Sequence, residues 1–81
     1  MQKSLSRAKQ ESLLIFLREM REEAGLRQLD VATRLDQPQS FVSKYESGER
    51  RLDLLELEQV CNACDTQLTE FIRRYTAVDR R

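Results

Sequence analysis

The amino-acid sequence predicts an all-α fold, arranged as a bundle of five helices. The chain of 81 residues contains one proline and two glycines, so few positions force a turn. Valine and threonine are sparse, and no run of residues alternates between apolar and polar as a half-buried strand would. Apolar residues instead recur at spacings of three and four, the period of a helix with one buried face.

The first helix is expected to run from between residues 6 and 9 to Ala24. Gly25 then supplies the left-handed residue that ends it. Leu14 and Phe16 widen its apolar stripe, and we expect them to make a second contact with the N-terminal extension or with a partner chain. The stripe itself comprises Leu13, Leu17, Met20 and Ala24.

A short second helix is expected over Gln28–Leu35. Asp36 follows where the chain must turn, and aspartate tolerates left-handed backbone better than most residues. The inner face of this helix carries Val31, Ala32 and Leu35.

The third helix is expected to begin near Pro38, since proline suits the first helical position, and to end at Gly48. This start places Gln37 at the N-cap. Val42 and Tyr45 lie three residues apart and are expected to point inward.

The fourth helix is expected from about Asp53 to Cys64, with Asp53 as N-cap and Glu56 close to a capping box. The fifth is expected from Thr66 or Gln67 to Tyr75. The fourth helix has an apolar stripe of Leu54, Leu57, Val60, Cys61 and Cys64, and the fifth has one of Leu68, Phe71, Ile72 and Tyr75.

One domain over residues 1–81 is expected, because a chain of this length forms a single small core. We expect residues 1–8 to form a basic N-terminal arm and residues 76–81 to be a frayed tail. Formal net charge is zero, yet residues 1–10 carry three bases and no acid, and residues 53–70 carry five acids and no base. Such separation lets one face bind a polyanion.

Two cysteines, Cys61 and Cys64, have the spacing C-x-x-C. A structural zinc site needs about four ligands, and the chain has no histidine and no third cysteine. A redox pair usually accompanies a βαβ unit, which is not predicted here. We therefore expect both thiols to face the core and expect no metal site, no cofactor and no enzyme activity.

The second and third helices, joined by a turn of three or four residues, form a helix-turn-helix arrangement. Its packing needs a small residue where the helices cross, and Ala32 lies there. It also needs apolar anchors, which Val31, Leu35, Val42 and Tyr45 supply.

The segment LREMREEAGLRQLDVATRLDQPQSFVSKYESGERRLD resembles the Xre/Cro-type family of phage-repressor-like helix-turn-helix transcriptional regulators. The matching features are R-E-x-x-G-L-x-Q at Arg21–Gln28, Ala32, and Y-E-S-G at Tyr45–Gly48. Two positions depart from the family pattern, because Asp36 and Asp65 stand where glycine is usual. The resemblance implies a lambda-repressor-like DNA-binding domain that regulates transcription.

The resemblance makes the third helix the one that enters the major groove, with its N-terminal residues toward the bases. The outward candidates are Gln39, Ser40, Ser43 and Lys44. Gln can bond adenine in a bidentate manner, and Lys can donate to guanine. Phe41 either touches DNA or packs against a neighbouring helix, and the sequence favours neither.

Phosphate contacts are expected from residues that flank the motif. Gln28 opens the second helix, where the family contacts a phosphate and supports the reading side chains, and Arg27 precedes it. Arg50 and Arg51 follow the reading helix on a loop. The alternative for these arginines is an ordinary solvated surface.

The resemblance also pairs Glu46 with Arg21 in a partly buried ion pair, which would neutralise an acid near DNA. Proteins of this type usually bind a palindromic operator as homodimers. We expect Ile72 and Tyr75 to be shared with a partner, while Leu68 and Phe71 lie inside.

The sequence thus predicts a sequence-specific transcriptional regulator of double-stranded DNA. The alternative is a protein-interaction or antitoxin-type regulator that uses the same fold mainly to bind a partner protein. No apolar run approaches the length of a membrane span, and no small-molecule ligand is evident. We expect a cytoplasmic bacterial protein that associates with the nucleoid when bound to DNA.

Overall fold

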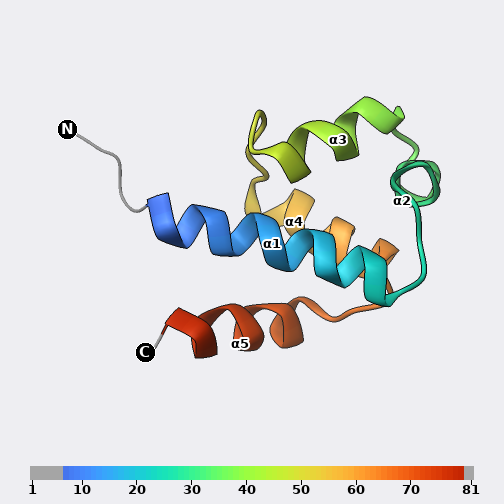
Figure 1. Ribbon diagram of the computed structural model, residues 1–81. Helices are drawn as coiled ribbons and strands as arrows, with labels where there is room; N and C mark the ends of the chain where they lie inside the picture. The colour runs from blue at the N-terminus through green and yellow to red at the C-terminus, as the bar shows by residue number, and fades with distance from the viewer. Residues whose placement is uncertain (1–6, 80–81) are drawn as a thin grey trace.

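The computed structural model describes residues 7–79, and these form five helices (Figure 1). α1 (Arg7–Glu23) runs across the molecule, with α3 (Gln39–Ser47) on one side of it and α5 (Leu68–Asp79) on the other (Figure 1). α2 (Gln28–Leu35) closes one end, and α4 (Leu54–Ala63) packs against both α2 and α5. None of the described helices combines the length and hydropathy needed to cross a membrane.

The buried core gathers at least one side chain from each helix. It includes the expected pairs Leu17 and Met20, Val31 and Ala32, and Val42 and Tyr45, with Phe71 from α5. Leu68 is partly buried against the same core. Burial of these side chains stabilises the bundle, because each large apolar side chain removed from water contributes roughly 1.5–3 kcal/mol.

Several helix boundaries differ from the expected ones, since α1 ends at Glu23 instead of Ala24 and α5 begins at Leu68 instead of Thr66 or Gln67. Pro38 is the N-cap of α3 rather than its first residue, and its extended backbone (φ −69°, ψ 156°) keeps it outside the helix. α5 continues to Asp79 instead of ending at Tyr75, since no glycine or proline stops it there. Residues 76–79 are therefore helical, contrary to the expected frayed tail, and residues 80–81 lie outside the described residues.

The expected N-terminal arm begins outside the described residues, which exclude positions 1–6. Its last two residues, Arg7 and Ala8, belong to the first turn of α1. Phe16, further along α1, was expected to contact the N-terminal extension or a partner chain, but its ring meets that of Tyr75 in α5 at a centroid distance of 6.4 Å. The Phe16 contact is therefore made within the chain.

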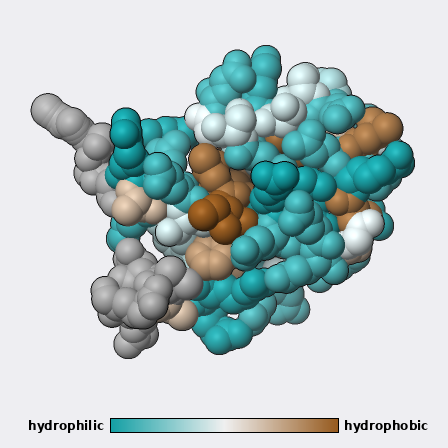
Figure 2. Space-filling view, viewed as in Figure 1, coloured by the Kyte–Doolittle hydropathy of each residue, from teal (hydrophilic) through white to brown (hydrophobic). Residues whose placement is uncertain are grey.

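Leu54 was expected on the buried stripe of α4, and this expectation is wrong. The side chain is 69% exposed, and the neighbouring Leu55 is 64% exposed, because the first turn of α4 lies outside the core. The buried stripe of α4 continues instead through Val60, Cys61 and Cys64. Figure 2 shows a further apolar patch over α1, surrounded by hydrophilic residues.

Candidate nucleic-acid interface

The turn between α2 and α3 is built on an aspartate in left-handed geometry. Asp36 has φ 57° and ψ 44°, and its N–H donates to the carbonyl of Thr33 at 3.1 Å. The next N–H, from Gln37, reaches the carbonyl of Ala32 at 2.9 Å. Asp65 repeats this geometry at the end of α4, with φ 59°. Aspartate thus occupies both left-handed turns where glycine is usual in the family.

The outward face of α3, including its amino end, presents polar side chains to solvent. No side chain caps this helix, so its first N–H groups are not occupied by a capping residue. Lys44 makes no side-chain hydrogen bond or ion pair with another described residue. The exposed residues on this surface are Gln39, Ser40, Ser43 and Lys44, the four that the sequence predicted to face outward.

Gln39 is also linked to the interior through a second glutamine. Its Nε2 donates to Oε1 of Gln28 at 3.4 Å, and Nε2 of Gln28 donates to Oε1 of Glu46 at 3.2 Å. Gln28, the first residue of α2, therefore links Gln39, the first residue of α3, to the carboxylate of Glu46 near the other end of α3. Sequence reasoning predicted a supporting role for Gln28 but missed its bond to Glu46.

The ion pair expected between Arg21 and Glu46 is present. Arg21 Nε donates to Glu46 Oε2 at 2.7 Å, and Arg21 Nη2 donates to Oε1 at 3.1 Å. The two side chains are 11% and 6% exposed. Hydrogen bonding to Glu46 raises the pKa of Arg21, despite the opposing effect of burial. This bidentate pair ties α3 to α1.

Arg27, expected to contact phosphate, is paired with Asp30 inside the chain. Its Nη2 donates to Asp30 Oδ1 at 2.9 Å, and its backbone N–H donates to Oδ2 at 2.8 Å. Hydrogen bonding to Arg27 lowers the pKa of Asp30 to about 2. The positive charge beside the start of α2 is therefore offset by an ionised neighbour.

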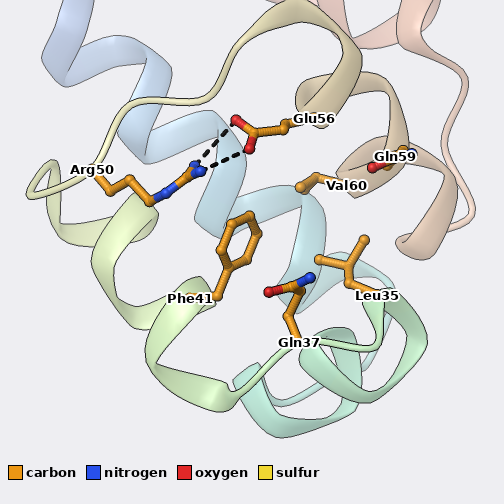
Figure 3. Close-up of a pocket in the computed structure, with 7 residues that line it drawn as sticks. All are labelled: Leu35, Gln37, Phe41, Arg50, Glu56, Gln59 and Val60. Carbon is orange, nitrogen blue, oxygen red and sulfur yellow. Dashed lines mark hydrogen bonds and ion pairs between the residues drawn. The ribbon is translucent and has the colours of Figure 1, made fainter.

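Arg50, also expected to contact phosphate, turns back onto the protein (Figure 3). Its Nη2 donates to Glu56 Oε2 at 2.7 Å, and its Nη1 donates to Oε1 at 3.1 Å. The guanidinium lies over the ring of Phe41, 4.7 Å from the centroid, in cation–π geometry. Hydrogen bonding to Arg50 lowers the pKa of Glu56 to about 2.

Phe41 packs against neighbouring side chains, as one of the two alternatives predicted. Its ring points from α3 toward α4 (Figure 3) and meets Tyr45 edge to face at a centroid distance of 5.6 Å. Together with Leu35 and Val60 it lines a pocket of about 360 Å³.

Arg51 keeps an exposed side chain, and no ion pair joins it to another described residue. It is the next residue after Arg50, but the structure separates the two. The guanidinium of Arg50 is paired with Glu56 of α4, whereas the side chain of Arg51 is exposed to solvent. Sequence alone gave both arginines the same role.

The two cysteines face the core, as expected. Cys61 and Cys64 are free thiols, 0% and 2% exposed. Burial raises the pKa of each thiol to about 11, so the reactive thiolate is scarce at neutral pH.

Three charged residues have structural roles that sequence reasoning missed. Glu56 caps α4, as predicted, but it also holds Arg50. Asp30 holds Arg27. Arg34 donates to the carbonyl of Ala63 at 2.7 Å, which satisfies a helix-terminal acceptor of α4. Asp30 lies three residues after Arg27, the N-cap of α2, and this spacing could have predicted that pair. The other two contacts join separate elements.

The expected dimer residues lie on α5. Ile72 is 39% exposed, and Tyr75 is partly covered by Phe16. Phe71, by contrast, is 3% exposed.

Comparisons with known proteins agree with this geometry. The helix-turn-helix family model matches residues 17–71, which is most of the chain. A solved structure of an XRE-family like protein from Pseudomonas syringae pv. tomato str. DC3000 is 41% identical and superposes with a TM-score of 0.83. That similarity covers 88% of this chain and 87% of the other. None of the curated protein sequences matches significantly.

Two more distant structures share the fold. A variant of the restriction-modification controller protein C.Esp1396I is 18% identical, with a TM-score of 0.81 over 95% of this chain and 98% of that one. The clp gene regulator ClgR from C. glutamicum is 20% identical, with a TM-score of 0.75 over 94% of this chain and 95% of that one. On its family match, this chain belongs to the Xre-type helix-turn-helix family of DNA-binding transcription regulators.

Proposed function

We propose that this regulator reads the major groove of a specific operator with the outward face of α3. The observation that carries the proposal is the separation of roles between the two faces of this helix. Val42 and Tyr45 are buried and Glu46 is paired on one face, while Gln39, Ser40, Ser43 and Lys44 remain exposed on the other. A helix anchored in this way can present its polar face to base edges without rearranging its core.

Each exposed side chain offers a different contact. Gln39 can bond the N6 and N7 atoms of adenine, and Lys44 can donate to O6 and N7 of guanine. Ser40 and Ser43 can accept or donate and therefore tolerate several bases.

Phosphate contacts position the protein and are assigned to fewer residues than the sequence suggested. Arg51 is exposed and has no carboxylate partner among the described residues, so its charge is available to DNA. Gln28 stands at the start of α2, where free N–H groups favour a phosphate. In this proposal Arg27 and Arg50 instead stabilise the fold through Asp30 and Glu56.

Dimerisation through α5 would let two reading helices bind a palindrome with half-sites about one helical turn apart. Ile72 supports this proposal because it is a large apolar side chain left partly exposed. Ile72→Asp should shift the protein toward monomers in sedimentation velocity. An unchanged dimer would show that the dimer interface does not include Ile72.

The test of the main proposal is selection of bound DNA from a random pool at moderate salt. The expected result is an enriched palindromic sequence whose affinity falls steeply with salt, because phosphate contacts release counterions. No enrichment, or an affinity insensitive to salt, would overturn the proposal.

A second candidate function is binding of a partner protein. It is favoured by two adjacent exposed leucines, Leu54 and Leu55, at the start of α4. Contiguous exposed apolar residues commonly mark protein interaction sites. This candidate predicts that the random-pool selection fails while Leu54→Ser abolishes partner binding.

A further inference from the structure

We propose that Glu46 determines the base preference of Gln39 by fixing, through Gln28, which way round the Gln39 amide faces DNA. This inference rests on the proposed reading role of α3 and adds a specificity-determining residue that does not itself touch a base.

The chain of contacts starts at a side chain that can only accept hydrogen bonds. Arg21 holds both carboxylate oxygens of Glu46, at 2.7 and 3.1 Å, and the Glu46 side chain is 6% exposed. A carboxylate in such a pair has no proton to donate. The group of Gln28 that faces it, 3.2 Å away, must therefore be the NH₂ group.

This constraint passes to the next amide. With its NH₂ turned toward Glu46, Gln28 directs its carbonyl oxygen at Gln39, whose Nε2 lies 3.4 Å away, at the long end of the hydrogen-bonding range. A carbonyl oxygen can only accept, so Gln39 also turns its NH₂ group toward Gln28. Either amide alone could rotate by half a turn, and a buried ion pair selects one arrangement for both.

A fixed amide distinguishes bases that a rotating amide does not. Gln39 retains its carbonyl oxygen and its second N–H for DNA. Adenine presents an acceptor at N7 beside a donor at N6, and one amide satisfies both. Guanine presents acceptors at both N7 and O6, so the fixed carbonyl oxygen opposes an acceptor. If the amide can turn over, its carbonyl oxygen faces Gln28 and both N–H groups can donate to N7 and O6 of guanine, so the discrimination falls.

The experiment uses the operator selected by the full-length protein. The half-site position read by Gln39 is identified as the one whose base preference disappears in Gln39→Ala. At that position wild-type protein should prefer adenine over guanine by about ten-fold, the scale of one bidentate contact. Gln28→Ala and Glu46→Gln should each reduce this ratio at least about three-fold, because both release the Gln39 amide.

Two further variants separate positioning from general stability. The double variant Gln28→Ala, Glu46→Gln should have the same adenine-to-guanine ratio as Gln28→Ala, since Glu46 acts through Gln28. Glu56→Gln weakens another ion pair near α3 but should leave the ratio unchanged. Gln28→Ala keeps the Arg21–Glu46 pair, so it remains informative even if Glu46→Gln fails to fold.

Three results would overturn the inference. An unchanged ratio in Gln28→Ala would do so, as would a base other than adenine at the Gln39 position. An adenine-to-guanine ratio that is lower in the double variant than in Gln28→Ala would also overturn it. If wild-type protein shows no sequence-selective binding, the proposed function fails and this inference fails with it. Selective binding with an unchanged ratio defeats the inference alone.

Discussion

The two sides of α3 are built from different kinds of contact. On the packed side, Tyr45 is 1% exposed and Glu46 is paired with Arg21, and Gly48 then ends the helix in left-handed geometry. On the outward side, Ser40 and the other polar residues are exposed. The comparison teaches that one side of the helix fixes its position, which leaves the other side available to bind a ligand.

The largest expected effect is on the packed side of α3. Arg21→Ala removes one partner of a buried pair and leaves Glu46 with Gln28 alone, so the free energy of unfolding should fall by about 3 kcal/mol. Urea unfolding followed by circular dichroism measures this change. A loss well below about 1 kcal/mol would show that the pair behaves like a solvent-exposed one.

Gly48→Ala tests the turn that ends the anchored region. Its φ of 86° is unfavourable for alanine, and an added Cβ would lie 3.0 Å from Leu14 Cδ1. We expect a loss of about 2 kcal/mol in the free energy of unfolding. Gly25→Ala is the matched control, because Gly25 has φ 76° but no atom within 4 Å of an added Cβ. It should lose only the backbone part, about 1 kcal/mol. Equal losses would mean that Leu14 moves aside without strain.

Arg51→Ala sharpens the comparison between neighbouring arginines. The exposed guanidinium should contribute one phosphate contact, so its loss should weaken binding to all sequences and reduce the salt slope by about 1. Arg50→Ala is the control, since Arg50 is held by Glu56. A smaller salt slope in Arg50→Ala would show that Arg50 leaves Glu56 and binds a phosphate when DNA is present.

The smallest expected effect is in the acid stability of the loop after α3. The pKa of Glu56 is lowered to about 2 in the folded protein, below the ordinary value of 4.5. Its contribution to stability is therefore fully present above pH 4.5 and is lost as the pH falls toward 2. Glu56→Gln should lose less stability than wild type over this interval in acid unfolding curves. Parallel curves would contradict the assigned role.

The sequence was most informative where local chemistry decides the structure. The range Gln28–Leu35, the capping box of Asp53 and Glu56, and the burial of Cys61 were all predicted and are present. Each depends on helical periodicity or on residues three apart. The family resemblance, rather than periodicity, supplied the Arg21–Glu46 pair.

The sequence was less informative where distant side chains compete for one partner. Arg50 and Arg51 are neighbours of the same type, and only the position of Glu56 on α4 separates their roles. Leu54 fits the periodicity of a buried stripe, yet the first turn of α4 lies beyond the core. Tertiary placement decides such cases, and helical spacing carries no information about it.

The most direct test of the central claim compares base preferences after loss of an outward residue of α3 and after loss of a paired arginine packed beside it. Wild-type protein, Lys44→Ala and Arg50→Ala would be titrated against every single-base variant of the selected operator. We predict that Lys44→Ala relaxes the preference at one position per half-site, by roughly 1–3 kcal/mol, whereas Arg50→Ala retains every preference. Unchanged preferences in Lys44→Ala, or relaxed ones in Arg50→Ala, would contradict the division of roles between the outward and the packed side of α3.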